Sequence, residues 1–285
     1  MSNNKNIAIV GANSILGQAI YERLIKDYAV FQVYHLNIDA IKNKINLIQI
    51  DDFLKTDIDF KIIYYISAAI SFKEDITTIN SLFHTNIKLL KTVSNTFTNS
   101  KIIYASSVAV FEINAAIVTE ISPVLPYSSY AFSKLWAEQI VANHVGGGVT
   151  IRLSSLYGIG MKNNSFLPKI IYDAISNKQI TIFGDGSRKQ NYISADEASE
   201  YFYKAIHYPD KIKLLAVNSQ SYSNLEVAQM IVKSIQDVKI IFLAQDTSTS
   251  FNYNNNFTKN ILKINQDYSF NESIQEVIQW IQKLY

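Results

Sequence analysis

The sequence predicts an α/β fold: a doubly wound parallel sheet with a smaller, interleaved C-terminal lobe. Short apolar runs of the kind that form buried strands recur along the first 153 residues. Helical patterns separate several of these runs, near residues 15–27, 77–96 and 128–146. Strands that alternate with helices in this way are typical of a parallel sheet covered by helices on both faces.

The composition is that of a folded protein without a strongly charged partner. Of the 285 residues, 48% are hydrophobic and 18% are charged, which excludes a disordered chain. The net charge is +2 and no basic stripe interleaved with aromatic residues appears, so we expect no nucleic-acid partner. No signal peptide precedes the first strand and no apolar run is long enough to span a membrane, which predicts a cytoplasmic protein without a membrane partner. The chain has no cysteine and its four histidines lack zinc-ligand spacing, so we expect no metal site.

The first strand, at residues 7–10, runs into a glycine turn and a helix that extends to about Asp27. Gly11 would allow the turn and Gly17 would allow close packing of helix on strand, which leaves the first helical amides to hold a pyrophosphate. Ser14 stands where a middle glycine would fall, and a simple strand-to-helix turn is the alternative interpretation. We predict a dinucleotide-binding, Rossmann-type arrangement with contacts from Gly11, Asn13, Ser14, Ile15, Leu16 and Gly17.

The next three strands, near residues 29–36, 47–50 and 62–66, predict further cofactor contacts at their carboxyl ends. An acidic residue after the second strand would indicate NAD and an arginine NADP, but residues 34–37 include neither. We therefore predict NAD and leave NADP open. The candidate contacts are His35, Asp51, Asp52, Ala68 and Ala69, with Asn86 from the following helix.

Tyr130 and Lys134 lie four residues apart near the start of a predicted helix, so they share one helical face. An ammonium and a cationic nicotinamide would both favour the phenolate and lower a pKa that is ordinarily about 10. Such a pair could move a proton on or off a sugar hydroxyl. The fifth strand, at residues 101–105, delivers Ser106 and Ser107 to the same edge of the sheet, where one hydroxyl would hydrogen bond a substrate oxygen. The alternative is an ordinary amphipathic helix in which the tyrosine and lysine fall four apart by chance.

After a sixth strand the chain leaves the sheet and begins the smaller lobe. The lobe should contain helices at about 167–177 and 224–236 and a strand at 179–183. We predict a dinucleotide-binding domain at residues 1–157, with a returning segment at about 190–218, and a substrate-binding lobe at residues 158–189 and 219–285.

The order of these motifs resembles the extended short-chain dehydrogenase/reductase family, in its nucleotide-sugar epimerase and dehydratase branch. Beyond the glycine turn, the likeness rests on residues 86–90, 106–111, 130–134, 152–158, 182–187 and 191–196, and it covers essentially the whole chain. The resemblance implies that Tyr130 is the acid-base residue, that Lys134 holds the nicotinamide ribose, and that Ser107 hydrogen bonds the reacting oxygen. Ser106 is the fallback for Ser107. Asn86 matches a helix asparagine that in relatives supports the active-site backbone and a proton-relay water.

Several residues depart from the family pattern. Ser14 replaces a glycine, His35 stands where many relatives have aspartate, and Phe111 replaces a common tyrosine. Ser155 stands where relatives often place a phosphate-binding asparagine, and Gln190 stands where an arginine grips the diphosphate. Arg188 or Lys189 could supply the missing charge, so a nucleotide-diphosphate sugar remains the implied substrate. The implied substrate-binding residues are Ser107, Ser155, Arg188 and Gln190.

The residues after Ser107 separate the reactions of this family. Sugar 4,6-dehydratases carry acidic residues there, whereas this chain has Val108 and Ala109, which disfavours dehydration. Epimerase-reductases that make fucose nucleotides need a cysteine, which is absent. We predict an NAD(P)-dependent nucleotide-sugar epimerase that inverts C4 through a transient keto sugar. The alternatives are an NAD(P)H-dependent nucleotide keto-sugar reductase and a non-catalytic NAD(P)-binding sensor, which the Tyr130–Lys134 pair disfavours.

The resemblance also implies a homodimer. In relatives, the helices that carry Asn86 and Tyr130 pair with their symmetry mates as a four-helix bundle. Apolar residues on the outer faces of these helices would then need a partner. The predicted contact residues are Leu82, Phe83, Leu135, Trp136 and Ile140.

Overall fold

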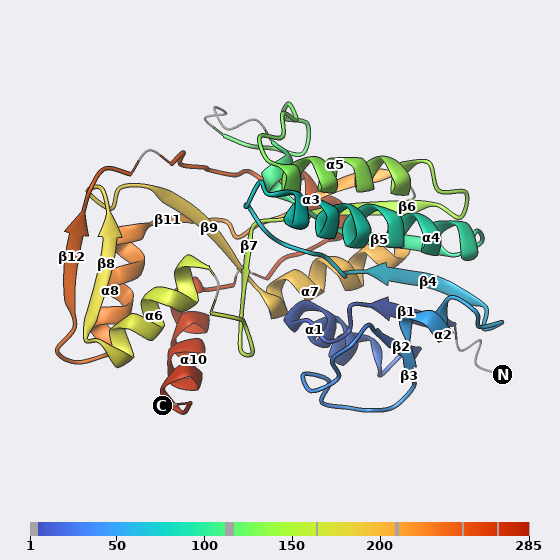
Figure 1. Ribbon diagram of the computed structural model, residues 1–285, viewed down its shortest axis with the longest axis horizontal. Coiled ribbons are helices and arrows are strands. Elements are labelled where there is room, and N and C mark those ends of the chain that lie inside the picture. Colours follow the sequence, from blue (N-terminus) through green and yellow to red (C-terminus); the bar gives the residue numbers. More distant parts are fainter. Residues whose placement is uncertain are drawn as a thin grey trace.

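A seven-stranded parallel sheet forms the centre of the larger part of the molecule, as the sequence predicted. The computed structural model describes residues 5–111, 117–163, 165–208, 211–246, 248–266 and 268–284. The strand order β10-β6-β5-β4-β1-β2-β3 has its crossover beside β1, as in a doubly wound fold (Figure 1). The strands are β1 (Asn6–Val10), β2 (Ala29–Tyr34), β3 (Leu47–Gln49), β4 (Phe60–Tyr65), β5 (Lys101–Ser107), β6 (Gly148–Leu153) and β10 (Ile212–Ala216).

Helices cover both faces of this sheet. On one face α1 (Ile15–Leu24) packs against α7 (Ala195–Lys204), and their apolar side chains join one buried cluster with the strands. On the other face lie α2 (Ile50–Phe53), α4 (Leu89–Thr96) and α5 (Ser129–Ala142), which contribute to a second cluster. Figure 1 shows these two layers on either side of the strands. Because both faces are buried, the strands read as continuous apolar runs rather than alternating ones.

The helix predicted for residues 77–96 is continuous but changes its winding in the middle. α3 (Ile76–Leu82) passes into a π-helical segment, Phe83–Lys88, and then into α4. The hydroxyl of Tyr65 on β4 donates a 2.8 Å hydrogen bond to the carbonyl of Thr85 in this segment. Short π-helical segments recur at functional sites, and this one carries Asn86.

The smaller part has its own apolar core. A parallel strand pair, β8 (Gln179–Phe183) and β12 (Lys239–Leu243), packs with three helices around one buried cluster. The helices are α6 (Phe166–Ser176), α8 (Asn224–Ser234) and α10 (Phe270–Gln282), and the shorter α9 (Asn256–Leu262) follows β12. The predicted strand and both predicted helices are therefore present. The domain limits inferred from the sequence stay a prediction.

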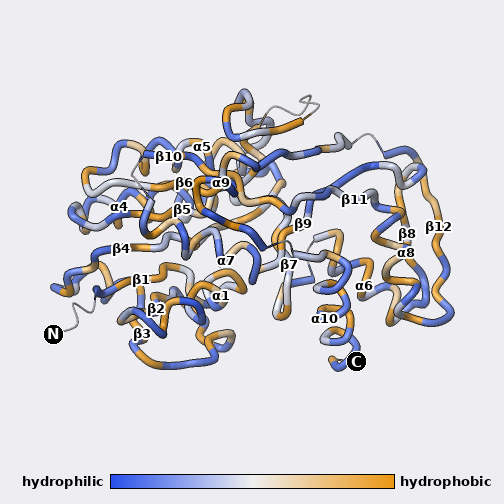
Figure 2. The backbone as a smooth tube through the Cα atoms, turned by 180° about the vertical axis from the view of Figure 1, so that it is seen from behind, coloured by the Kyte–Doolittle hydropathy of each residue, from blue (hydrophilic) through white to orange (hydrophobic). Residues whose placement is uncertain are grey.

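A second small sheet links the two parts, and the sequence analysis did not foresee it. β7 (Ser155–Tyr157) and β11 (Ser221–Ser223) flank β9 (Lys189–Ser194). Two of these strands have only three residues, too few to show an alternating pattern. Seen from behind, β7 and β9 lie between the sheet of the larger part and the helices of the smaller part (Figure 2).

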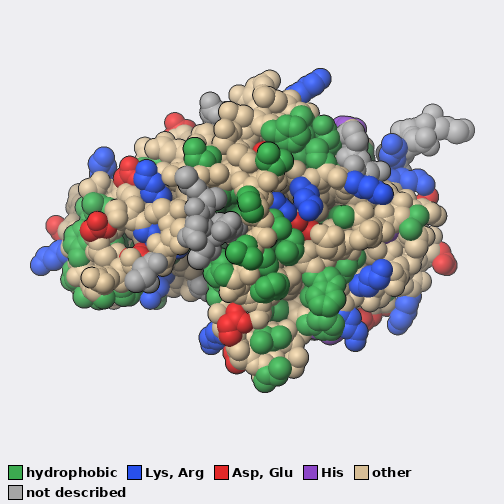
Figure 3. Space-filling model, turned by 90° about the horizontal axis from the view of Figure 1, so that it is seen from above, with side chains coloured by type: hydrophobic (Ala, Val, Ile, Leu, Met, Phe, Trp, Pro, Cys, Tyr) green, Lys and Arg blue, Asp and Glu red, His purple; other side chains and the backbone are tan. Residues whose placement is uncertain are grey.

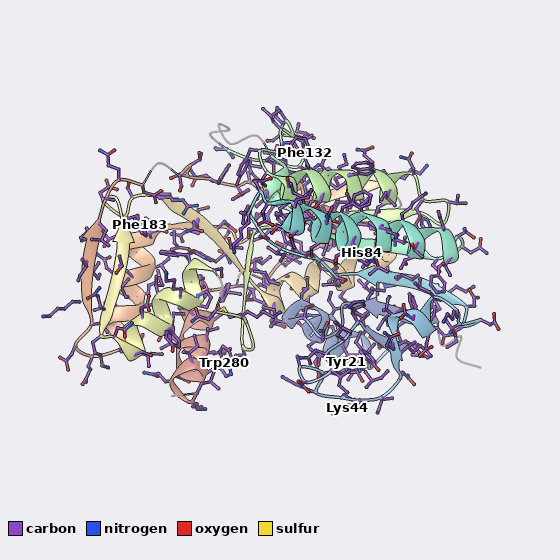
Figure 4. The ribbon with its side chains drawn as sticks, in the orientation of Figure 1. Tyr21, Lys44, His84, Phe132, Phe183 and Trp280 are labelled. Carbon is purple, nitrogen blue, oxygen red and sulfur yellow. The ribbon has the colours of Figure 1, made fainter. Side chains whose placement is uncertain are left out.

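The face predicted to pair with a second copy is smaller than expected. Leu82 is buried within the chain, so it was placed wrongly on an open face, whereas Leu135 and Ile140 are half-buried and pack in part against interior clusters. Phe83 and Trp136 are exposed and their rings touch edge to face, with centroids 6.3 Å apart. Phe132 is exposed on α5, and apolar side chains gather in patches on the surface seen from above (Figures 3 and 4). No helix in the described ranges is long and apolar enough to cross a membrane.

Candidate active site

The carboxyl ends of the parallel strands meet along one edge of the large sheet. Val10 at the end of β1 pairs with Tyr65 at the end of β4. Further along, Ser107 at the end of β5 pairs with Leu153 at the end of β6. The glycine turn, the loop after β4, Ser107 and Ser155 therefore follow one another along the same edge, where ligands of doubly wound sheets bind.

The glycine turn after β1 is compact. Gly11 has φ +94°, and a Cβ there would lie 2.6 Å from the amide nitrogen of Ser67 in the loop after β4. A Cβ on Gly17 would lie 2.6 Å from the carbonyl oxygen of Gly11, so α1 approaches β1 more closely than another residue would allow. Ser14 caps α1: its hydroxyl donates to the Gly11 carbonyl at 2.8 Å and accepts from the Gly17 amide at 3.0 Å.

The start of α1 can hold an anion. The amides of Ile15 and Leu16 open the helix and therefore have no carbonyl within it to bind. Their dipoles and the positive end of the helix favour a negatively charged group. Asn13 is half-buried beside them, and Leu16 is buried. The six residues predicted for this turn thus form one unit, and the serine in place of a glycine acts as the helix cap.

The residues predicted to contact the adenine ribose are more exposed than those of the glycine turn. His35, Asp51 and Asp52 are all exposed, and the two aspartates lie in the first turn of α2 rather than at the end of a strand. Gln49 links the two segments, because its side chain accepts from the Asp51 amide at 2.7 Å and donates to the His35 carbonyl at 3.3 Å. Residues 34–37 after β2 include neither the acidic residue typical of NAD sites nor the arginine typical of NADP sites.

Asn86 joins three parts of the site. Its side-chain oxygen accepts from the Ala69 amide at 2.8 Å, and its nitrogen donates to the Ala69 carbonyl at 3.0 Å. The same nitrogen donates to the Ser133 hydroxyl at 2.9 Å, and Ser133 in turn donates to the Tyr130 carbonyl at 2.7 Å. The π-helical residue therefore fixes the loop that contains Ala68 and Ala69 to the first turn of α5.

The end of β5 docks onto α5 through three consecutive residues. The Nζ atom of Lys134 donates to the Ala105 carbonyl at 2.8 Å. Ser106 is buried and donates to Glu138 at 2.7 Å, whereas the hydroxyl of Ser107 hydrogen bonds the phenol of Tyr130. The structure thus brings Ser107, Tyr130 and Lys134 together and turns the fallback Ser106 toward another partner.

The electrostatics of this group differ from the expectation. Burial raises the pKa of Tyr130 to about 12, although the Ser107 hydrogen bond lowers it. Burial lowers the pKa of Lys134 to about 7, although the carboxylate of Glu138 raises it. The expected lowering of the tyrosine pKa required a cationic cofactor as well as the lysine. In the protein alone, desolvation outweighs the lysine because its ammonium binds the Ala105 carbonyl and lies 5.9 Å from the tyrosine ring centroid.

Sequence reasoning missed three residues around this group. Phe72, from the loop after β4, packs edge-on against the Tyr130 ring with centroids 5.3 Å apart. Glu74 accepts hydrogen bonds from the amide and the hydroxyl of Ser129 at the start of α5. Glu138 was also missed, although its position four residues after Lys134 places it on the same helical face.

The predicted substrate residues lie around the start of β9. Ser155 and Gln190 line the same small cavity of about 40 Å3, together with Tyr157, Phe166 and Tyr192. The side chain of Gln190 donates to Asn224 at 3.0 Å. Arg188 is half-buried and not part of that lining, and its Nε is buried without a hydrogen-bond partner among the described residues.

Arg188 nevertheless affects this cavity. Burial raises the pKa of Tyr192, and the charge of Arg188 partly opposes that rise. The hydroxyl of Tyr192 is buried without a hydrogen-bond partner in the described part of the chain. In the same part of the chain, no cluster of three or more histidine, aspartate or glutamate side chains could hold a metal ion.

The fold and this arrangement define a class: a doubly wound sheet with a glycine turn and a Ser–Tyr–Lys group at its carboxyl edge is the architecture of extended short-chain dehydrogenases/reductases. The model of the NAD dependent epimerase/dehydratase family matches residues 7–217. The chain therefore belongs to that family, which confirms the resemblance noted in the sequence.

Solved structures of similar fold include both epimerases and dehydratases. UDP-glucuronic acid 4-epimerase from Bacillus cereus, in complex with UDP-glucuronic acid and NAD, matches with a TM-score of 0.86 and 18% identity over 98% of this chain and 100% of that chain. dTDP-glucose 4,6-dehydratase from Bacillus anthracis str. Ames, in complex with NAD, matches with a TM-score of 0.82 and 18% identity over 98% of this chain and 97% of that chain. At these identities the likeness shows a shared fold.

The curated relatives are longer than this chain. A trifunctional UDP-glucose 4,6-dehydratase/UDP-4-keto-6-deoxy-D-glucose 3,5-epimerase/UDP-4-keto-L-rhamnose-reductase of Arabidopsis thaliana is 24% identical over 236 residues. The match covers 71% of this chain and 35% of that protein, and a second enzyme of the same description matches in the same way. The chain thus spans about a third of the length of the curated relatives that it matches.

Proposed function

We propose that this protein is an NAD-dependent nucleotide-sugar epimerase that inverts C4 of the sugar through a transient keto sugar. One observation carries the proposal: the end of β5 and the start of α5 bring Ser107, Tyr130 and Lys134 together, while the turn after Ser107 has only apolar side chains. This set can move one proton at one oxygen, which is what reversible oxidation of a hydroxyl requires. The similarity of fold to a 4-epimerase over nearly the whole chain supports it.

The glycine turn fits a dinucleotide. The amides of Ile15 and Leu16 would hold the pyrophosphate, and the small residues Ala68 and Ala69 would let the cofactor lie against the end of β4. Lys134 would hold the nicotinamide ribose. NAD bound in this place would accept a hydride from C4 and return it. Because Gly11 and Gly17 leave no space for a Cβ, substitution at either would disturb this turn.

Tyr130 and Ser107 would handle the proton at the C4 oxygen. The Ser107 hydroxyl accepts from the Ala109 amide at 3.1 Å, so its own proton is available for Tyr130 or for the sugar oxygen. Tyr130 would take the C4 hydroxyl proton as the carbonyl forms and give it back when the hydroxyl is restored on the other face. With a phenol pKa raised to about 12, the base form needs a nearby cation, which is the role we assign to the Lys134 ammonium.

The substrate is proposed to be a nucleotide-diphosphate sugar. Ser155 and Gln190, in the cavity beside β9, would contact it through neutral hydrogen bonds. Arg188 would supply the charge for the diphosphate, since its Nε is buried without a partner among the described residues and a guanidinium binds phosphate oxygens in pairs.

A keto-sugar reductase is the second candidate, because the same three residues serve a one-way reduction and the matched curated relatives include a reductase activity. Dehydration is less well supported, since Val108 and Ala109 offer no carboxyl group beside Ser107.

The deciding assay incubates the protein with pairs of UDP-sugars that differ at C4, UDP-glucuronic acid and its epimer among them. Product is followed by NMR and cofactor by absorbance. We expect interconversion without net formation of reduced nicotinamide; conversion only with stoichiometric loss of reduced cofactor would make the protein a reductase.

We also propose a homodimer through the exposed faces of the α3–α4 helix and α5. Phe83, Phe132 and Trp136 are each about half exposed there, and burying such rings together would stabilise a dimer. Light scattering at micromolar concentration should give twice the mass of the chain. Trp136→Glu should shift the mass toward a monomer, whereas Phe183→Glu, on the distant strand β8, should not; a monomeric wild type would contradict the proposal.

A further inference from the structure

Three consecutive residues of β5 bind three residues of α5 that lie one turn apart. Ala105 accepts from Lys134, Ser106 donates to Glu138, and Ser107 bonds Tyr130. Glu138 therefore belongs to the same set of contacts between β5 and α5 as the proposed catalytic pair, Tyr130 and Lys134. Its side chain is wholly buried.

Glu138 has an unusually complete set of partners. Arg152 on β6 binds both of its carboxylate oxygens, at 2.9 Å from Nε and 2.8 Å from the terminal nitrogen. Ser106 adds a third bond at 2.7 Å, and Lys213 on β10 approaches to 3.9 Å. Arg152 is itself 2% exposed and lies over the Phe111 ring, so the ion pair is fully desolvated.

A buried ion pair is a poor device for stability alone. Removing two charges from water costs several kcal/mol, and apolar side chains of the same size often stabilise a fold as well or better. The position of the pair indicates a different use. Its carboxylate belongs to a residue one helical turn from Lys134, a lysine that is itself buried and donates a hydrogen bond to the Ala105 carbonyl.

Charged and titratable groups from several elements lie around Lys134, and among the described residues the Glu138 carboxylate is the charge that raises its pKa. Burial lowers the pKa of Lys134 to about 7, and the Glu138 carboxylate opposes this. Without the carboxylate, the lysine would share its buried surroundings with the Arg152 cation and lose its proton more easily. The groups that face this region are Tyr130 and Glu138 from α5, Tyr104 from β5, Arg152 from β6 and Lys213 from β10.

We propose that Glu138 is a positioning residue that acts on the reaction through Lys134, and that Ser106 and Arg152 hold its carboxylate in place for this purpose. The role of Lys134 in the reaction rests on the function proposed above. The electrostatic effect of Glu138 on Lys134 does not, because it follows from the contacts of the protein alone. Ser106, the fallback hydroxyl of the sequence analysis, thus receives a separate task.

The direct test measures the titration of Lys134 without cofactor or substrate. The Nζ signal of 15N-labelled lysine, assigned by its disappearance in Lys134→Met, is followed by NMR from pH 5 to 10. In Glu138→Gln we expect the Lys134 pKa to fall by about one unit or more. Ser106→Ala loses one of three bonds to the carboxylate but keeps its charge and both bonds from Arg152, so the Lys134 pKa should fall much less than in Glu138→Gln. An unchanged pKa in Glu138→Gln, or an equal shift in Ser106→Ala, would overturn the proposal.

Two further measurements guard this test. Glu138→Gln leaves Arg152 buried without a counter-charge; if it does not fold, Glu138→Gln/Arg152→Met removes both charges and should show a smaller fall of the Lys134 pKa, because the attraction of Glu138 is lost without the repulsion of Arg152. In the holoenzyme, the basic limb of the pH–turnover profile should move down with the pKa in Glu138→Gln and stay in place in the control Glu120→Gln. A profile that does not move while the pKa does would show that Glu138 does not act on the reaction. A wild type without any turnover would refute the proposed function and leave the titration to decide the effect on Lys134.

Discussion

The end of β5 and the start of β9 both contribute to the proposed site, but they are built in opposite ways. At the end of β5, Ala105, Ser106 and Ser107 each have a partner on α5. At the start of β9, the Nε of Arg188 and the hydroxyl of Tyr192 are buried without a hydrogen bond in the described structure. An unpaired buried polar group costs free energy. The hydroxyl of Tyr104 on β5 is unpaired as well, so the contrast concerns the three residues that follow it. These residues of the proposed chemical part are held fixed by α5, whereas the proposed recognition part leaves buried polar groups without partners among the described residues, and Gln190 there departs from the family pattern.

The largest effect is expected at the fixed end. Tyr130→Phe removes only the phenol oxygen, so the packing against Phe72 should survive. Turnover should fall by a factor of roughly 100 to 10,000, the usual range for loss of acid-base catalysis. Thermal unfolding and binding of NAD, measured by calorimetry, should change little. Near-native turnover would remove Tyr130 from the mechanism and, with it, the contrast between the two regions.

Lys134 should make the free energy of unfolding depend on pH. Its pKa is about 7 in the folded protein and about 10.4 in the unfolded chain. Between these values the unfolded chain holds a proton that the folded protein has lost, so the contribution of Lys134 to stability rises with pH from about 7 to about 10 and is constant below. The total rise should be on the order of 2 to 4 kcal/mol. The effect of the raised Tyr130 pKa has the opposite sign, and stability is lost only above about pH 10.

Urea unfolding of the wild type and of Lys134→Met at pH 7 and pH 9.5 measures the contribution of Lys134 to the free energy of unfolding. The contribution is the difference between the two proteins at each pH. The variant should be the more stable at pH 7, because it no longer buries a cation, and the gap should narrow at pH 9.5. The exposed Lys91→Met on α4 serves as the control and should run parallel to the wild type. A constant gap between wild type and Lys134→Met would mean that Lys134 keeps its ordinary pKa.

The two regions also differ in how well the sequence predicted them. The order of strands, glycine turn and helices was clear from periodicity, and four-residue spacing was enough to place Tyr130 and Lys134 on one face. The sequence did not show that Asn86 lies in a π-helical segment or that Ser106 turns to Glu138, because both depend on contacts between distant segments. The raised pKa of Tyr130 in the protein alone was not foreseen, because burial cannot be read from four-residue spacing. Around β9, the neighbouring strands β7 and β11 have only three residues each, too few to show an alternating pattern. The neutral residues Ser155 and Gln190 gave no sign of how a diphosphate would be bound.

The next prediction concerns Arg188, directly before β9. If its guanidinium binds the diphosphate, Arg188→Met should raise KM for a UDP-sugar by about 10- to 100-fold with little change in kcat, the loss expected for a charge-assisted pair. Lys189→Met is the matched control, since Lys189 is exposed and its neighbour Gln190 is retained. If Lys189→Met raises KM and Arg188→Met does not, the cation for the diphosphate is Lys189.

The smallest effect is expected from Gln190→Arg, which restores the residue that relatives place at this position. Gln190 lines the cavity beside Ser155 and donates to Asn224 at 3.0 Å. An arginine there would lose the good geometry of that bond while adding a second charge close to Arg188. The gain from a new phosphate contact and the cost of like charges should nearly cancel, so KM should change by no more than about threefold. In the background of Arg188→Met the repulsion is absent, and Gln190→Arg should then lower KM by about tenfold. Additive effects of the two substitutions would show that Arg188 and position 190 do not share one phosphate site, and the recognition side would have to be sought elsewhere.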